Sequence, residues 1–253
     1  SINRWRPFDK HWRNYTPRSY YITHSLSPLM HATGATPRRV TAFNVYAPTE
    51  GDVPVASQVG DRAAIVTMQN DDGSVFKVSG CAAFGAHHNA YRVCGTNGQI
   101  ENLRGMDSKI MLRYSDWAIP EGREEVNLYE PQWNDKDEEI IEKSGHGGGD
   151  YIVARMFLDC IKEGKQPEHP YDIYSAVAMS SVGILAHRSI LNGGVPYDIP
   201  DFRVAECREQ YRNDRQTPFW GSDGSAPNIP CCSVTDFRPT EEQLKNYDEA
   251  IKG

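Results

Sequence analysis

The chain has 253 residues, of which 39% are hydrophobic, and its formal net charge is −7. This length can bury a substantial core in one large domain or two small ones. The acidic balance without a basic face argues against a nucleic-acid surface, and the chain has no run of about 18 apolar residues that could span a membrane.

The six cysteines show neither zinc-site spacing nor a dense disulfide framework. Cys160 falls on an apolar helix face and Cys81 and Cys94 in strands, where a thiol usually acts as a small hydrophobic group. We therefore expect a reducing compartment and a cytoplasmic protein. No signal peptide is visible at the start of the chain, and an exported parent that has lost its leader is the alternative.

Residues 1–19 interleave aromatic and basic side chains without a clear period. Indole rings stack on sugar faces and arginines donate to hydroxyls or carboxylates, so this arm could line a sugar pocket. The alternative is a surface arm whose arginines are simply solvated.

The stretch from 18 to 34 predicts a helix that ends at Gly34. Its apolar residues recur at roughly helical spacing: Ile22, Leu26, Leu29 and Met30. Its first turns carry groups that can handle protons: Tyr20, Tyr21, Thr23 and His24. The alternative is a core helix in which His24 bonds a backbone carbonyl.

A series of β-rich runs follows, joined by tight turns. Asn70-Asp-Asp-Gly73 and Gly95-Thr-Asn-Gly98 are hairpin signals, which predict an antiparallel sheet rather than one with helical crossovers. The expected strands are residues 39–46, 63–69, 74–82, 89–94, 99–103, 109–114 and 126–129. Residues 115–145 are acidic and polar and indicate a solvated excursion at the rim of the sheet.

His87 and His88 lie between two expected strands. Neighbours in an extended strand point to opposite faces, so a metal would need ligands from elsewhere. The chain offers no carboxylate-histidine spacing of that kind, and we predict no metal site.

The segment Ser144-Gly-His146-Gly-Gly-Gly-Asp150 precedes an amphipathic helix. Its glycines would let the backbone approach a ligand closely, and free N–H groups there favour an oxygen-rich group. Asp150 is either a helix cap, its commonest role at such a position, or part of a site.

Residues 172–191 predict a second helix that is apolar nearly all round and packed on more than one side. Beyond residue 202 the chain becomes polar and rich in proline and glycine. No Gly-x-Gly-x-x-Gly follows an apolar strand, so we expect no Rossmann domain and no bound cofactor in this chain.

Tyr21-Ile-Thr-His24-Ser-Leu-Ser-Pro28 resembles the Tyr-Pro-Thr-His-Gly-Leu-Gly-Pro stretch of the NAD-dependent family 109 glycoside hydrolases, a branch of the Gfo/Idh/MocA oxidoreductases. His146-Gly-Gly-Gly-Asp150, Gly95-Thr-Asn-Gly98 and the closing helix are similar to segments of the same superfamily, so the resemblance covers most of residues 20–202. The sequence departs from the superfamily at Tyr20, where an Asp is usual, and from the glycosidases at Ser25 and Ser27.

The resemblance implies an α+β fold: an open, mostly antiparallel sheet with helices on one face, at residues 20–202. An arm at 1–19 and a C-terminal extension at 203–253 would flank it. The other face of the sheet would pack against a second subunit. The nucleotide-binding Rossmann half, with its NAD or NADP, would lie outside this chain.

The resemblance also implies a function: the substrate-binding part of an oxidoreductase acting on a sugar or cyclic polyol, or of an NAD-dependent glycosidase. Tyr21 and His24 would be catalytic and manage protons at a carbon–hydroxyl centre. Arg13, His87, His146 and Asp150 would contact the substrate. The competing reading is a carbohydrate-binding or assembly module without catalysis.

Overall fold

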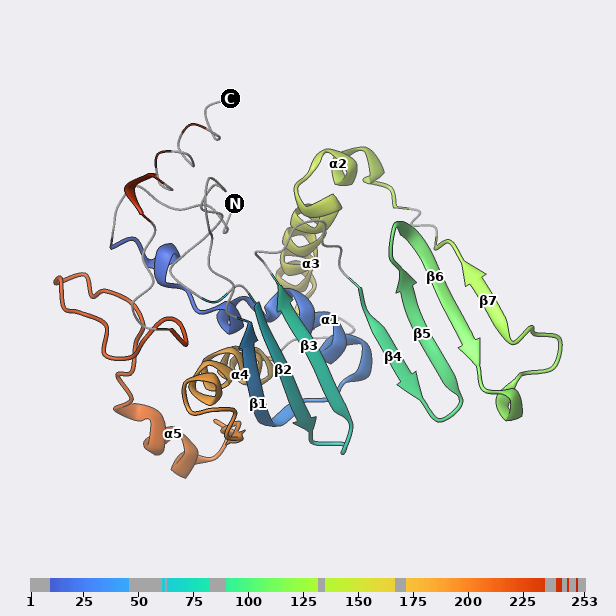
Figure 1. The fold of residues 1–253 in the computed structure, drawn as a ribbon. Helices are drawn as coiled ribbons and strands as arrows, with labels where there is room; N and C mark the ends of the chain where they lie inside the picture. Colours follow the sequence, from blue (N-terminus) through green and yellow to red (C-terminus); the bar gives the residue numbers. More distant parts are fainter. Residues whose placement is uncertain are drawn as a thin grey trace. The chain divides into compact units, whose positions relative to one another are not determined.

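The computed structural model describes residues 10–45, 61, 63–81, 90–131, 135–166, 172–234, 240–242, 245 and 249. They divide into two compact units, and Figure 1 shows the course of the chain, coloured by residue number. The first unit consists of the described residues up to 81 and from 173 onwards, and the second of those from 90 to 172. The expected boundaries after residues 19 and 202 stay a prediction.

The first unit holds a four-stranded antiparallel sheet in the order β3-β2-β1-β8. Its strands are β1 (Pro37–Val45), β2 (Ala63–Asn70), β3 (Val75–Cys81) and β8 (Tyr197–Asp198). The pairing of Ala42 with Val66, and of Val66 with Val78, puts these apolar side chains on one face. That face is buried, whereas Phe43 and Ile65 point to the other face and are exposed.

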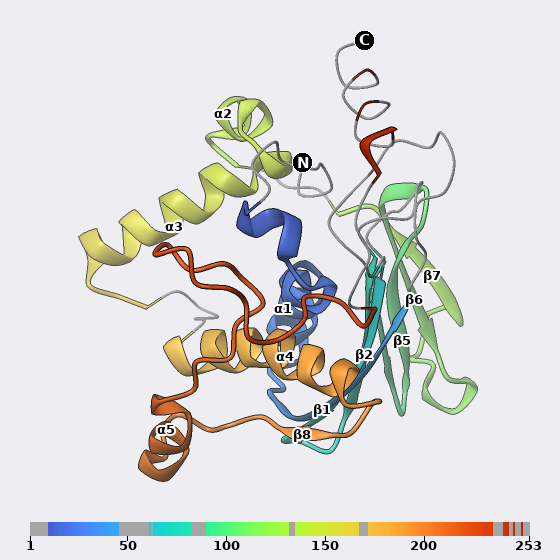
Figure 2. The ribbon, with the colours of Figure 1, turned by 60° about the vertical axis from the view of Figure 1, so that its left-hand side comes forward.

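Two helices cover the buried face, α1 (Thr23–Thr33) and α4 (Ile173–Leu191) (Figure 2). α1 ends as predicted at Gly34, whose φ of 74° is the left-handed conformation that glycine adopts without a Cβ clash. α4 has apolar side chains nearly all round, and it contacts β1, α1 and the 3₁₀ helix η2 (Arg18–Tyr21). A second 3₁₀ helix, η1 (Trp12–Tyr15), precedes η2. The most deeply buried apolar residues include Ile22, Leu26, Val40, Met68 and Val182.

The second unit contains its own four-stranded antiparallel sheet, in the order β4-β5-β6-β7. The strands are β4 (Arg92–Gly95), β5 (Gly98–Leu103), β6 (Met106–Tyr114) and β7 (Val126–Tyr129), with η3 (Asp116–Ala118) between the last two. Two helices follow, α2 (Glu138–Lys143) and α3 (Gly149–Glu163), with η4 (His146–Gly148) between them. The predicted α+β class is confirmed, and the strands form two sheets of four.

The chain after α4 is tied to the rest of the first unit through side-chain hydrogen bonds. The short helix α5 (Ala205–Arg212) comes first, and irregular backbone follows to residue 234. His187 Nε2 donates to the Pro230 carbonyl oxygen at 2.7 Å, and Arg188 forms an ion pair with Asp214. Ser233 Oγ donates to Asp61 Oδ1 at 2.7 Å. We call residues 213–234 the C-terminal strap.

Among the residues that the structure describes, no helix combines the length and the apolar run needed to cross a membrane.

The buried His187 predicts a pH dependence of stability. Burial lowers the pKa of His187. The imidazole therefore binds a proton less readily in the folded protein than in the unfolded chain, where the pKa of histidine is about 6.5. The unfolded state therefore takes up more protons as the pH falls. We expect the contribution of His187 to the free energy of unfolding to be complete above about pH 7. This contribution should be lost as the pH falls through about 6.5.

Urea unfolding followed by near-ultraviolet circular dichroism across that range would measure the slope. The variant His187→Gln keeps an N–H donor for Pro230 but does not titrate, so it should flatten this part of the profile. His31→Gln, at an exposed position of α1, is the control and should leave the slope unchanged. An equal slope in His187→Gln and the natural chain would contradict the role assigned to burial.

Candidate active site

Tyr21 and His24 form a stacked pair at the junction of η2 and α1. Their ring centroids lie 4.7 Å apart, with 22° between the ring planes. Thr23 Oγ1 lies 3.5 Å from His24 Nδ1. Both rings are exposed, with 40% of Tyr21 open to solvent. The structure thus brings together the two residues predicted to be catalytic, with a phenol and an imidazole facing solvent.

The residues around this pair are held by buried contacts. Arg18 Nε donates to the Asp61 carbonyl oxygen at 2.8 Å, and Ser19 Oγ donates to the Gly183 carbonyl oxygen at 2.9 Å. Ile22, between the two rings in sequence, is 1% exposed. A Cβ at Gly183 would lie 2.9 Å from the Ser19 carbonyl oxygen, closer than real Cβ contacts. Only glycine lets η2 approach α4 this closely.

Tyr20 belongs to the interior instead of the exposed pair. Its ring meets His187 and Phe219 edge-on, at centroid distances of 5.8 and 6.0 Å. Burial raises the pKa of Tyr20 to about 12, against the opposing charge of Arg188. A phenol with so high a pKa stays protonated at neutral pH. The sequence analysis grouped Tyr20 with the residues that can handle protons. The structure differs, because the Tyr20 ring packs against His187 and against Phe219 of the C-terminal strap.

His146 and Asp150 form a second pair, in the second unit. His146 Nδ1 lies 2.9 Å from Asp150 Oδ1, and both side chains are largely exposed. A carboxylate accepts, so the imidazole carries its proton on Nδ1 and keeps Nε2 as an acceptor. The N-cap of α3 is Gly148, and Asp150 lies in the first turn of the helix, where its side chain bonds His146. Its role as a substrate contact stays a prediction.

The backbone around His146 adopts an uncommon conformation. His146, Gly147 and Gly148 have φ values of 55°, 62° and 98°, all in the left-handed region. His146 is the only non-glycine residue with positive φ among those described. A Cβ at Gly148 would lie 2.4 Å from Ile141 Cγ2, which explains the glycine there. Such a conformation costs free energy and persists only where the surroundings fix it.

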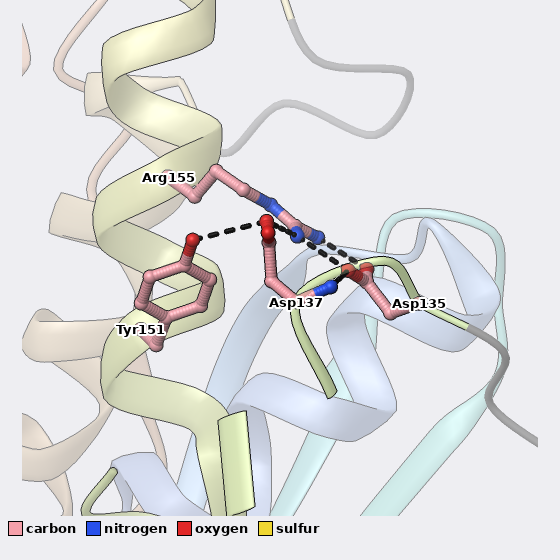
Figure 3. A network of polar contacts seen from close by, with 4 residues as sticks. All are labelled: Asp135, Asp137, Tyr151 and Arg155. Atoms are coloured by element: carbon pink, nitrogen blue, oxygen red, sulfur yellow. Dashed lines mark hydrogen bonds and ion pairs between the residues drawn. The ribbon is translucent and has the colours of Figure 1, made fainter. Parts of the chain in front are cut away.

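An ionic clamp fixes those surroundings (Figure 3). Arg155 donates to both carboxylate oxygens of Asp135 at 2.7 and 2.6 Å, and to Asp137 Oδ2 at 2.8 Å. Tyr151 Oη donates to the same Asp137 oxygen at 3.0 Å. The hydrogen bonds from Arg155 lower the pKa of Asp135 to about 2, so the clamp is ionised at neutral pH. It closes the chain between 137 and 151 into a loop that contains His146.

The sequence analysis missed this clamp, because it assigned residues 115–145 to a solvated excursion. One available signal was the pair Tyr151 and Arg155, four residues apart and hence on one face of an otherwise apolar helix. Polar side chains on a helix face that packs against the protein require partners. The alternating carboxylates Asp135 and Asp137 were the nearest acceptors upstream.

The remaining predicted contacts belong to neither pair. Arg13 lies in η1, where its guanidinium stacks on Trp12 at 4.5 Å from the ring centroid. His87 falls outside the described residues. Within the described part of the chain, no group of three or more His, Cys, Asp or Glu side chains could hold a metal ion.

The described glycine run does not fit a dinucleotide. It lies between two helices, α2 and α3, whereas a pyrophosphate loop follows a strand. None of the described residues is therefore assigned to NAD or NADP.

Sequence comparison identifies relatives of this chain. The sequence model of the family described as glycosyl hydrolase 109, C-terminal domain, matches residues 58–209. A glycosyl hydrolase family 109 protein of Solibacter usitatus is 37% identical over 94 residues, which is 35% of this chain and 21% of that protein. An alpha-N-acetylgalactosaminidase of Tannerella forsythia is 45% identical over 60 residues, 24% of this chain and 12% of that protein. The matches span only a small part of these curated relatives.

Solved structures share the fold. A levoglucosan dehydrogenase in complex with NADH and L-sorbose gives a TM-score of 0.51 at 17% identity, covering 72% of this chain and 50% of that chain. Gal80p from Saccharomyces cerevisiae, in a super-repressor mutant form, gives a TM-score of 0.51 at 13% identity, covering 77% and 54%. At such identities the likeness shows the fold alone, and the C-terminal fold of the Gfo/Idh/MocA oxidoreductases predicted from the sequence is confirmed.

The close approach of Gly183 to η2 predicts that a single added methyl disturbs the Tyr21–His24 pair. Gly183→Ala raises helix propensity by about 1 kcal/mol, but overpacking costs about 1–3 kcal/mol. We expect a net loss of stability and a changed ring-current shift of the His24 imidazole protons in the NMR spectrum. Ser180→Ala, at an exposed position of α4, is the control and should leave both unchanged. An unchanged chemical shift of the His24 imidazole protons in Gly183→Ala would contradict the role of Gly183 in positioning the pair.

Proposed function

This chain belongs to the glycosyl hydrolase 109 family through its C-terminal domain, and from that premise we propose that it is the substrate-binding part of a larger enzyme that acts on a sugar or cyclic polyol. The Tyr21–His24 pair carries the proposal. A stacked phenol and imidazole that face solvent on a buried frame can exchange protons with a substrate hydroxyl. A mere assembly unit has no need of such a pair.

In this proposal Tyr21 and His24 move the proton of the reacting hydroxyl. Separately, the His146 imidazole of the second unit, oriented by Asp150, would accept a hydrogen bond from a sugar hydroxyl at Nε2. Arg13 and His87 complete the proposed contacts. A nicotinamide held by residues outside this chain would supply hydride chemistry when bound.

Two observations bear on the choice between glycosidase and dehydrogenase. The chain's relatives include a protein named alpha-N-acetylgalactosaminidase, which supports hydrolysis of a glycoside. Tyr20 stands where the dehydrogenases of the superfamily have an aspartate, and its ring packs inward against His187. A phenol with a raised pKa does not replace a carboxylate as a proton relay, so we favour the glycosidase reaction.

The non-enzymatic alternative is a carbohydrate-binding or assembly module. The fold is similar to that of a super-repressor form of Gal80p, so the experiment below also tests this alternative.

The test uses the protein that carries this chain at its natural length. His24→Ala should lower kcat on a chromogenic N-acetylgalactosaminide by about 10²–10⁴-fold, the range that a positioned acid–base group contributes. Tyr21→Phe should lower it similarly, because it removes the hydroxyl and keeps the ring. His31→Ala, on the exposed side of the same helix, is the control. Assays with added NAD⁺ or NADP⁺ would identify the cofactor, and full turnover by His24→Ala would refute the role of the pair.

We further propose that the open face of the first sheet packs against a second copy of this chain. Phe43, Ile65 and Val75 point to that face and are 62%, 43% and 63% exposed. Such apolar exposure on one sheet face indicates an interface.

The variant Phe43→Lys with Ile65→Lys should shift the mass measured by light scattering from dimer or higher to monomer, because two charges would be buried without partners. Val204→Lys, which alters an exposed apolar residue off the sheet, should leave the mass unchanged. A natural chain that is monomeric at every concentration would contradict the proposal.

A further inference from the structure

The second unit carries a hollow of about 560 Å³, and none of the predicted site residues that the structure describes lines it. The hairpin between β4 and β5, the end of β6, η3 and the start of β7 form its walls. The side chains that matter are Gln99, Arg113, Asp116, Trp117 and Glu125. All lie within the second unit, so the hollow is complete there.

The frame of the hollow is fixed by backbone contacts. Ser115 N donates to the Asn97 carbonyl oxygen at 2.9 Å, and Ser115 Oγ donates to the Thr96 carbonyl oxygen at 3.3 Å. Gly98 passes so close to β6 that a Cβ there would lie 2.2 Å from the Arg113 carbonyl oxygen. These contacts tie η3 to the hairpin turn. Trp117 therefore stands on strands and a turn of fixed geometry.

Trp117 gives the hollow a flat apolar platform. It is 77% exposed, the highest value among the large hydrophobic side chains of the described residues. Trp117 N donates to Asp116 Oδ1 at 2.9 Å, which holds the start of η3. An exposed indole of this kind has an apolar face and one N–H donor, the combination that suits a partner with both apolar and polar surface.

The polar groups beside the indole suit neutral hydroxyls. Arg113 Nε and Nη2 both donate to Glu125 Oε1, at 2.9 and 2.7 Å. Among the described residues these are the only hydrogen bonds of the two side chains, which leaves Arg113 Nη1 as a donor and Glu125 Oε2 as an acceptor. Gln99 adds an amide. Glu125 neutralises Arg113 and Asp116 adds a negative charge, so the hollow disfavours an anion.

From this arrangement we propose that the hollow binds a pyranose ring of a neutral saccharide, stacked on Trp117 and hydrogen-bonded by Arg113, Glu125 and Gln99. The apolar C–H face of the ring covers the indole, and its hydroxyls meet both donors and acceptors. This is a binding site without catalysis, separate from the Tyr21–His24 pair. It would hold a glycan on the protein independently of the reaction.

The test is an NMR titration of the ¹⁵N-labelled chain with a methyl galactoside, a methyl N-acetylgalactosaminide and a neutral trisaccharide. Few contacts on an open surface predict a dissociation constant on the order of 1 mM or weaker. We expect shifts in the Trp117 indole N–H and in the backbone of residues 95–99 and 113–117. Trp117→Ala should weaken binding at least about tenfold, and Ile119→Ala, next to η3 but outside the hollow, should not.

Further arms separate this inference from the proposed function. The titration repeated with His24→Ala should give the same shifts, because His24 lies in the first unit. Glu125→Gln breaks the ion pair without emptying the hollow and should weaken binding, which guards against a folding effect of Trp117→Ala. No shift with any of the three saccharides, equal shifts in Trp117→Ala, or shifts at these residues on raising the protein concentration alone would each overturn the proposal.

Discussion

The packing of helix α4 is the interaction on which the first unit depends. Val182, Leu185 and Ala186 are almost fully buried, and the helix contacts β1 on one side and η2 on another. Burying apolar surface is the main favourable term in folding, and a helix that is apolar nearly all round needs cover on several sides. The C-terminal strap adds cover through His187 and Arg188. The same helix therefore holds the sheet, the η2 segment and the strap.

This dependence explains how an exposed pair of rings is positioned. Tyr21 and His24 stack on each other at the surface, and their backbone is anchored by Ser19, Ile22 and the close approach at Gly183. The reactive groups stay accessible while the cost of ordering them is met by buried neighbours. An exposed site on a rigid frame is the arrangement that binding from solution requires.

The second unit orients its imidazole by different physics. His146 is held by a carboxylate, by a left-handed backbone and by a loop that Arg155 closes onto two aspartates. Ion pairs rather than buried apolar contacts hold this segment in place, since none of the residues of α3 is buried. The carboxylates and the guanidinium are half-buried and still reach solvent, so the clamp derives its strength from bidentate geometry and from its several partners.

The sequence by itself determined the fold class and most of the secondary structure, although it did not predict α2 or α5. Helical spacing with Gly34 as a stop, and glycine-containing turns at 70–73 and 95–98, are local signals, and β1 to β7 lie close to the expected ranges. The sequence also determined the family, because motif order along the chain identifies it. The resemblance named Tyr21, His24, His146 and Asp150. They meet in two pairs in the structure because residues three or four apart on or near a helix lie on the same side.

Only the tertiary structure decided which polar groups turn inward. Tyr20 and Tyr21 are neighbours of one type, and the packing of His187 and Phe219 sends the first inside and leaves the second exposed. Asp135 and Asp137 read as a solvated run until Arg155, about 20 residues later, meets them. The hollow beside Trp117 needs four strands in register. Each depends on contacts between residues distant in sequence, which local spacing does not encode.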